Sequence, residues 1–212
     1  MTKILGGTDE ERLYLYNLKF DCDDDIVVVK RTDMPHMDEI VFNHKGRYGL
    51  VSAFCKPGMK VLDFPCGSGY GREILSLFRV DYEGRDNDKA TIEYCKLTQG
   101  PNFSVDDLSS PHLEERHYNL IACIEGIEHI EQEKQSRAVK HLYEALDYDG
   151  ILIITSPERG EVITNPYHKW EFKKSEFEQL LGTYFQDVQI LVKRGKNHKG
   201  EKTNFMYGIC YK

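Results

Sequence analysis

Segments of strand length, several of them almost continuous apolar runs, alternate along the chain with segments whose apolar residues recur at helical spacing. The predicted strands lie at residues 60–64, 80–86, 102–105, 118–124, 151–155, 185–192 and 205–211. The helical spacing recurs at residues 36–55, 70–78, 89–97, 131–146 and 174–181. Strands that alternate with helices predict an α/β fold: a doubly wound, mostly parallel sheet of seven strands with helices on both faces, Rossmann-like in its winding.

The first forty residues are predicted as an N-terminal helical or lid segment, ahead of a domain that spans residues 41–212. A capping box at Thr8 to Glu11 and the apolar residues after it predict a short helix over 8–20. Ile26 to Val29 are β-branched, so they favour an extended segment. A length of 212 residues with 40% hydrophobic content suits a single globular domain overall.

Composition narrows the partners that we expect. A net charge of −7 argues against broad, sequence-independent binding of nucleic acid, so small-molecule or glycan acceptors are the expected partners. No run has the length of a membrane helix or the core of a signal peptide, which predicts no membrane partner. The six cysteines form no C-x-x-C pair and are interpreted as reduced thiols of a cytoplasmic protein. The pattern carries no signal for an oligomeric state.

The strand at residues 60–64 leads into a glycine-rich turn, Pro65-Cys66-Gly67-Ser68-Gly69-Tyr70-Gly71. Glycines at alternate positions fit a tight strand-to-helix turn that needs positive φ and that lets a ligand approach the backbone. The helix that begins near Tyr70 would direct its first N–H groups to the same crevice, which favours a carboxylate, ribose or phosphate. No Gly-Lys-Ser/Thr follows, which excludes a P-loop, and the spacing differs from the dinucleotide fingerprint.

Asp63 and Cys66 complete the pattern V-L-D-x-x-C-G-x-G-x-G, which resembles the first motif of class I S-adenosylmethionine-dependent methyltransferases. The resemblance extends over about residues 40–212 and implies S-adenosylmethionine as the cofactor, with its methionine and ribose on the glycine turn. Pro65 departs from the family, which more often has Gly there, and removes one N–H from the turn. The cofactor contacts implied for this stretch are Asp63, Pro65, Gly67, Ser68, Gly69 and Tyr70.

Acidic residues at two other strand ends extend the cofactor site. Asp86, with Asn87 after it, lies about 20 residues beyond the turn, where an acidic side chain can accept hydrogen bonds from both ribose hydroxyls. Asp88 is predicted to cap the helix 89–97. Asp106 resembles the family's third motif, whose Asp binds the adenine amino group; Asp107 is the alternative, and a plain turn remains open.

A histidine and an arginine in the first long helix offer a further cofactor contact. His44-x-x-Arg47-Tyr48 resembles a stretch of sugar and glycan methyltransferases that lies beside the methionine end of the cofactor. The alternative is an exposed Arg and a packed Tyr.

The run at residues 118–124 ends in Glu125-Gly126-Ile127-Glu128-His129, and the carboxyl end of a parallel strand faces the ligand crevice. E-x-x-E-H resembles the O-methyltransferases of ubiquinone biosynthesis and the small-RNA 3′-terminal 2′-O-methyltransferases, where two Glu and the His hold a divalent cation. In many other methyltransferases of this pattern these residues shape the acceptor pocket. Both interpretations stay open.

A long loop at residues 156–172 contains Asn165-Pro166-Tyr167-His168 followed by Glu171-Phe172. It resembles the acceptor loop of glycan-associated methyltransferases, and also the small-RNA enzymes, in which the loop His completes the metal shell. A surface cover over the sheet edge is the alternative. The catalytic candidates are therefore Glu128, His129 and His168, and the candidate ligands of Mg²⁺ or Mn²⁺ are Glu125, Glu128, His129 and His168. Glu125 is also a candidate cofactor contact.

The predicted activity is transfer of a methyl group from S-adenosylmethionine to a hydroxyl of a sugar or other small-molecule acceptor, with His129 or His168 as general base. Two alternatives remain. One is a metal-dependent 2′-O-methyltransferase of RNA ends, and the other is a catalytically silent protein that binds S-adenosylmethionine.

Overall fold

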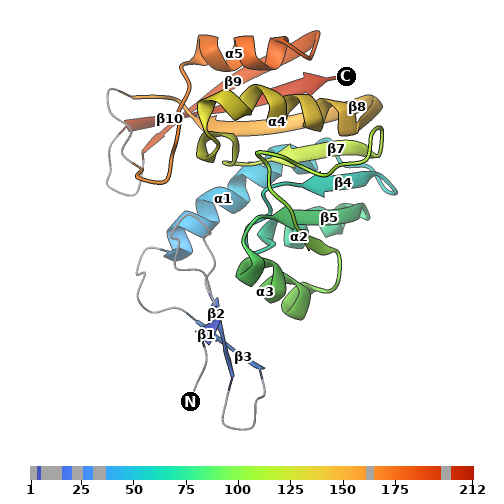
Figure 1. Ribbon diagram of the computed structural model, residues 1–212, viewed down its shortest axis with the longest axis vertical. Coiled ribbons are helices and arrows are strands. Elements are labelled where there is room, and N and C mark those ends of the chain that lie inside the picture. Colours follow the sequence, from blue (N-terminus) through green and yellow to red (C-terminus); the bar gives the residue numbers. More distant parts are fainter. Residues whose placement is uncertain (1–3, 6–15, 21–25, 31–36, 161–164, 197–201) are drawn as a thin grey trace.

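The computed structural model describes residues 4–5, 16–20, 26–30, 37–160, 165–196 and 202–212. A seven-stranded sheet in the order β6-β5-β4-β7-β8-β10-β9 forms its centre (Figure 1). Strands β6 to β8 run parallel, and β10 lies antiparallel between β8 and β9. The strands are β4 (Lys60–Asp63), β5 (Asp81–Asp86), β6 (Phe103–Val105), β7 (Tyr118–Cys123), β8 (Leu146–Pro157), β9 (Asp187–Lys196) and β10 (Lys202–Tyr211).

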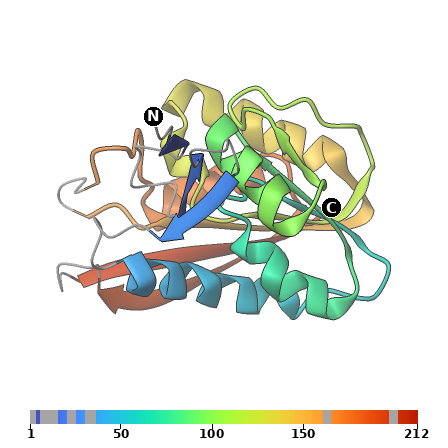
Figure 2. The same cartoon turned by 90° about the horizontal axis from the view of Figure 1, so that it is seen from below.

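Helices cover both faces of this sheet, which confirms the predicted doubly wound fold; Figure 2 shows α1 and α4 on opposite sides. Amphipathic spacing explains α4, whose buried residues Ala138, Val139, Leu142 and Ala145 repeat at helical intervals. Asp88 caps α3, as predicted, by accepting a hydrogen bond from the Ala90 amide at 3.3 Å. The helices are α1 (Met37–Ser52), α2 (Tyr70–Leu75), η2 (Ser76–Phe78), α3 (Lys89–Gln99), η3 (Ile127–His129), α4 (Gln132–Ala145) and α5 (Lys174–Gly182), where η is a 3-10 helix.

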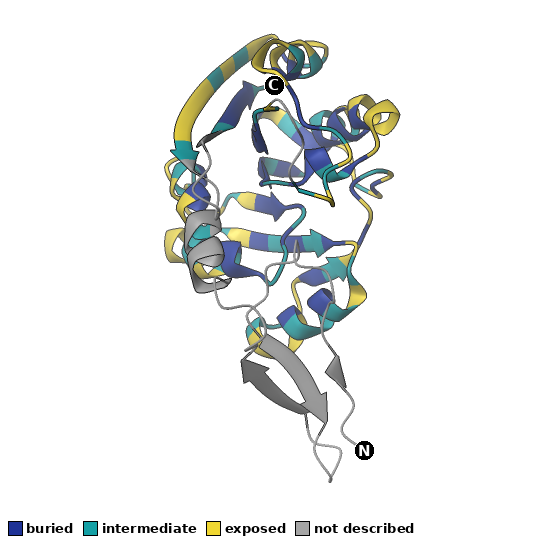
Figure 3. Cartoon of the chain, turned by 90° about the vertical axis from the view of Figure 1, so that its left-hand side faces the viewer, coloured by how far each residue is buried: buried dark blue, intermediate teal, exposed yellow. Residues whose placement is uncertain are grey.

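Two apolar cores lie on the two sides of the sheet. Successive residues of β7 divide between them, because side chains alternate along a strand: Leu120 and Ala122 pack with α1, α2 and α3, and Ile121 and Cys123 pack with α4 and α5. Figure 3 shows buried residues along the strands and exposed ones on the outer sides of the helices. The five described cysteines are free thiols, and no described helix is long and apolar enough to cross a membrane.

Near the N-terminus, β1 (Ile4–Leu5), β2 (Tyr16–Phe20) and β3 (Ile26–Lys30) form a small antiparallel sheet. The extended segment predicted at 26–29 is confirmed, but the helix predicted over 8–20 is wrong for residues 16–20. These residues alternate apolar and polar side chains and pair with the β-branched β3, so strand pairing prevails over helical propensity. The first part of the predicted helix, residues 8–15, lies outside the described residues.

Candidate active site

The glycine turn begins where β4 ends. Gly67 and Gly69 have φ of 51° and 76°, the left-handed conformation that the glycine spacing predicts. Gly69 directly precedes α2, which begins at Tyr70 as expected. The backbone of Ser68 is fastened from α3, because its carbonyl accepts a hydrogen bond from Gln99 Nε2 at 3.0 Å. Pro65 packs on the strand end opposite, where a Cβ on Gly126 would lie 2.3 Å from its Cδ.

Gly71, the third glycine of the turn, is required because a side chain there would clash with the core, not because a ligand approaches it. A Cβ on Gly71 would lie 2.3 Å from Oδ2 of Asp63 and 2.4 Å from the Tyr48 ring. Asp63 is fully buried and accepts hydrogen bonds from Tyr48 at 2.8 Å and Tyr82 at 2.7 Å. Tyr70 is also buried, with its ring edge-on to that of Tyr48 at 5.8 Å.

Asp63 and Tyr48 are both buried and support the turn from beneath, and their predicted contacts with the cofactor stay predictions. Burial raises the pKa of Asp63 to about 7, although the hydrogen bonds from Tyr82 and Tyr48 oppose the rise.

Asp86 connects the end of β5 to the turn. Its Oδ2 accepts a hydrogen bond from the Gly67 amide at 3.1 Å, and its Oδ1 accepts one from the Asp88 amide at 3.0 Å. The side chain is 1% exposed, whereas Asn87 beside it is exposed. This carboxylate therefore lies directly beneath the backbone of the turn, and its predicted contact with ribose stays a prediction.

The two candidates for the adenine contact take part in local hydrogen bonds. Asp106 accepts one from Arg85 Nη1 at 2.8 Å and one from the His112 amide at 3.1 Å. Burial would raise the pKa of Asp106, but the bonds from Arg85 and His112 outweigh it and lower the pKa. Asp107 is exposed and accepts hydrogen bonds from the amide and hydroxyl of Ser109, which is the turn that the sequence left open.

Arg47 and Glu125 meet on the other side of the turn. The Nη2 of Arg47 lies 3.2 Å from Oε2 of Glu125, and the guanidinium stacks on the ring of Phe205 at 4.5 Å. Arg47 is 5% exposed, so the predicted contrast of an exposed Arg with a packed Tyr does not hold. Within the described residues, Nε and Nη1 of Arg47 are buried without a hydrogen-bond partner. Two such donors fit a carboxylate or another planar anion.

Glu125 itself has a left-handed backbone with φ of 51°, which is uncommon for a residue other than glycine. Thr155 of β8 holds it there: the Thr155 hydroxyl accepts from the Glu125 amide at 2.9 Å and donates to its Oε1 at 2.8 Å. The carboxylate is thereby directed to Arg47.

Glu128, His129 and His168 form a second group of polar residues. One potential ligand atom from each lies within 4.8 Å of the others, and the two imidazoles meet edge to face at 4.9 Å. Glu125, predicted as a fourth metal ligand, is not part of this group and is paired with Arg47 instead. The backbone explains the approach of the loop, because the amides of Lys169 and Trp170 both donate to the Glu128 carbonyl.

Two residues beside His168 were missed as site residues by the sequence interpretation. Glu171 Oε1 lies 2.6 Å from His168 Nδ1, and both side chains are largely buried. The Asn165 amide lies 3.1 Å from Nε2 of the same ring. The H-x-x-E spacing was visible in the sequence, but only the folded loop shows that these side chains meet.

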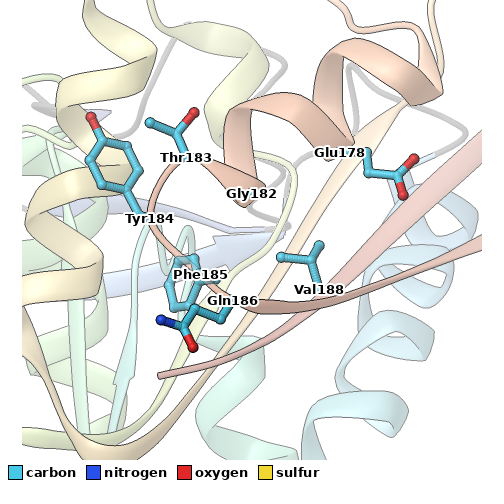
Figure 4. Close-up of a pocket in the computed structure, with 7 residues that line it drawn as sticks. All are labelled: Glu178, Gly182, Thr183, Tyr184, Phe185, Gln186 and Val188. Atoms are coloured by element: carbon cyan, nitrogen blue, oxygen red, sulfur yellow. The ribbon is translucent and has the colours of Figure 1, made fainter.

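A surface hollow at the end of α5 lies away from these groups (Figure 4). It is lined by Glu178, Gly182, Thr183, Tyr184, Phe185, Gln186 and Val188. The β9 strand begins beside it, at Asp187, which pairs through Tyr211 with Ile151 near the amino end of the parallel strands. The glycine turn and the histidines are at the carboxyl ends, so the hollow is no part of this site.

Comparison with known proteins agrees with this geometry. A family model described as a methyltransferase domain matches residues 44–192. A probable S-adenosylmethionine-dependent methyltransferase of Mycolicibacterium smegmatis is 25% identical over 154 residues, or 69% of this chain. The chain covers 58% of the length of that relative.

Solved structures share the fold. A SAM-dependent methyltransferase from Archaeoglobus fulgidus matches with a TM-score of 0.67 and 18% identity, over 82% of this chain and 94% of the other. Magnesium protoporphyrin IX methyltransferase from Synechocystis, solved with bound SAH, matches with a TM-score of 0.64 and 17% identity, over 82% and 86% of the two chains. The family model, which spans more than half of the sequence, shows that this chain belongs to the class I S-adenosylmethionine-dependent methyltransferases.

Proposed function

We propose that this chain transfers the methyl group of S-adenosylmethionine to a hydroxyl oxygen of a sugar or another small-molecule acceptor. The main observation that supports the proposal is that His168 Nδ1 lies 2.6 Å from Glu171 Oε1, next to the imidazole of His129. An oxygen nucleophile loses a proton when it is methylated. An imidazole held by a carboxylate is suited to accept that proton.

The chemistry requires only alignment and one proton acceptor. The bond from sulfur to the methyl carbon breaks as the bond from that carbon to the acceptor oxygen forms, which leaves S-adenosylhomocysteine and releases one proton. A carboxylate only accepts hydrogen bonds, so Glu171 places the hydrogen of neutral His168 on Nδ1. Nε2 is then the basic nitrogen; it accepts a hydrogen bond from the Asn165 amide, which the acceptor hydroxyl would replace.

The cofactor end of the proposal rests on the turn and on Arg47. Gly67 and Gly69 have the left-handed backbone that a close ligand approach needs, and a donor of Arg47 that is unpaired within the described residues would bind the carboxylate of the methionine moiety. We propose Asp86 and Asn87 as the ribose contacts and Asp106 or Asp107 as the adenine contact.

The test is methyl transfer from S-adenosylmethionine to a library of sugars and small hydroxyl compounds, measured as S-adenosylhomocysteine formed. With an accepted substrate, Glu171→Gln should lower kcat by about 100-fold and alter its pH profile, with the KM for S-adenosylmethionine unchanged. Glu176→Gln is the matched control, because Glu176 pairs with Arg159 at 2.8 Å and has no contact with His168 in the described structure. Turnover of amines or thiols but of no hydroxyl compound would contradict the oxygen acceptor.

A divalent cation is a second candidate feature of the site, favoured by the convergence of Glu128, His129 and His168. The residues fit a metal: the ligand atoms lie within 4.8 Å of one another, and Glu171 contacts the His168 ring as a supporting carboxylate commonly does. Since Glu125 is paired elsewhere, one carboxylate and two imidazoles remain, which suit Mn²⁺ better than Mg²⁺. Bound there, such a cation would make a coordinated hydroxyl easier to deprotonate.

Chelation tests whether the site needs a divalent cation. EDTA should abolish turnover and leave the affinity for S-adenosylhomocysteine nearly unchanged, and added Mn²⁺ should restore turnover. Full activity in EDTA would contradict the metal and leave His129 and His168 as base and pocket lining. The net charge of −7 favours a small diol over an RNA end as the acceptor.

A further inference from the structure

We infer that the hydrogen bond between Tyr48 and Asp63 is a latch that holds α1 against the glycine turn and thereby positions Arg47 for the cofactor. The inference rests on the proposed role of Arg47 at the methionine end of the cofactor. Tyr48 and Asp63 are buried beneath the turn, so they act on affinity without touching the ligand. They are positioning residues.

The latch lies where two elements distant in sequence meet. The Tyr48 hydroxyl of α1 donates to Oδ1 of Asp63, the last residue of β4, at 2.8 Å. Arg47 is the neighbouring residue of the same helix. Successive helical side chains differ in direction by a fixed angle, so fixing Tyr48 also fixes the direction of Arg47. The guanidinium then reaches Glu125 and lies over Phe205.

The glycine turn closes over this pair. A Cβ on Gly71 would strike both partners of the bond, at 2.3 Å from Asp63 Oδ2 and 2.4 Å from the Tyr48 ring. Tyr70 adds an edge-to-face contact with Tyr48 at 5.8 Å. The start of α2 therefore packs directly on Tyr48 and Asp63 and limits the space in which this bond can move.

The chain supplies a matched control for this bond. Tyr82, on β5, donates to the other oxygen of the same carboxylate at 2.7 Å, and it too is buried. Either Tyr→Phe change removes one hydroxyl from Asp63 in similar surroundings, so the two should cost similar stability. Of these two tyrosines, only Tyr48 is on α1, the helix that contains Arg47.

The experiment compares Tyr48→Phe and Tyr82→Phe in the full chain, with S-adenosylhomocysteine as the probe in titration calorimetry. Both variants should lose a similar amount of Tm, and binding is measured at a temperature where both remain folded. Tyr48→Phe should raise Kd about tenfold, whereas Tyr82→Phe should remain within about twofold of the wild type. In an Arg47→Ala background, Tyr48→Phe should have no further effect on Kd.

Equal changes of Kd in the two Phe variants would overturn the latch and leave Asp63 a structural carboxylate. A full tenfold effect of Tyr48→Phe in the Arg47→Ala background would overturn the route through Arg47. Failure of the latch alone is recognisable, because the wild type would still bind the probe. If the wild type bound no S-adenosylhomocysteine, the cofactor role of Arg47 would fail together with the latch.

Discussion

Asp86→Ala removes a carboxylate that serves the turn and, as proposed, the cofactor. The side chain is 1% exposed, and its two oxygens accept hydrogen bonds from the amides of Gly67 at 3.1 Å and Asp88 at 3.0 Å. The Gly67 amide belongs to a residue with φ of 51°, so Asp86 helps to hold the left-handed part of the turn. The substitution should therefore weaken both stability and cofactor binding.

The two effects have separate magnitudes. Hydrogen bonds to a charged group contribute about 1.5–3 kcal/mol, so the lost ribose contacts should cost roughly 2–3 kcal/mol of binding. That cost raises the Kd for S-adenosylmethionine by about 30- to 150-fold. The free energy of unfolding should fall by about 1–3 kcal/mol, because two partly buried amides lose their acceptor.

Titration calorimetry measures the first effect and urea unfolding the second. Asp88→Ala is the matched control: it removes the cap at Ala90 and a 2.6 Å hydrogen bond from Thr91, and about 1 kcal/mol of stability with them, without a proposed cofactor contact. Its Kd should equal that of the wild type. An unchanged Kd in Asp86→Ala would refute the ribose role, whatever happened to stability.

Three further predictions concern residues around the site. Gly71→Ala should abolish cofactor binding, because its Cβ would strike Asp63 and Tyr48; wild-type calorimetry would contradict this. Burial raises the pKa of Asp63 from 3.8 to about 7, so its proton stabilises the fold at low pH and that stability is lost as pH rises through 7. Urea unfolding from pH 4 to 8 should show this decline and Asp63→Asn should flatten it; equal slopes would refute the assignment. Trp170, whose ring lies 4.8 Å from the Arg159 guanidinium, should change its fluorescence when cofactor and acceptor bind together. An unchanged fluorescence during turnover would indicate that the loop containing Trp170 only covers the surface.

Local signals made most of the fold predictable. The sequence predicted all seven strands of the main sheet: the central β7 as an apolar run, as expected of a strand covered on both faces, and β9 and β10 from their alternation. The cap at Asp88 and the left-handed Gly67 and Gly69 were also predictable, since each depends on a few neighbouring residues. Strand β2 was missed because its alternation of apolar and polar residues extends over only five positions. Only its pairing with β3 identifies it as a strand.

The arrangement of the site depended on contacts between distant residues. No spacing rule brings Tyr48 of α1 under a turn that begins after Asp63, so the hydrogen bond between these two residues was not predictable from the sequence. The direction of Glu125 was unpredictable for the same reason. The E-x-x-E-H pattern groups it with Glu128, but its carboxylate binds Thr155 and Arg47 instead. Sequence patterns locate such residues at a strand end, whereas their direction is set by partners that only packing supplies.

Under the proposed function, the segment after β7 would contact both the cofactor side and the acceptor side. Glu125, held in a left-handed conformation, faces the proposed cofactor side through Arg47. Three residues later, within the short helix η3, Glu128 lies close to His168 on the proposed acceptor side. The methyl group would pass between these two sides, and their separation is set by one buried turn of backbone, fastened to β8 by Thr155 and to the loop by the amides of Lys169 and Trp170. The proposed in-line transfer would need such a fixed separation, and the left-handed backbone of Glu125 would help to set it.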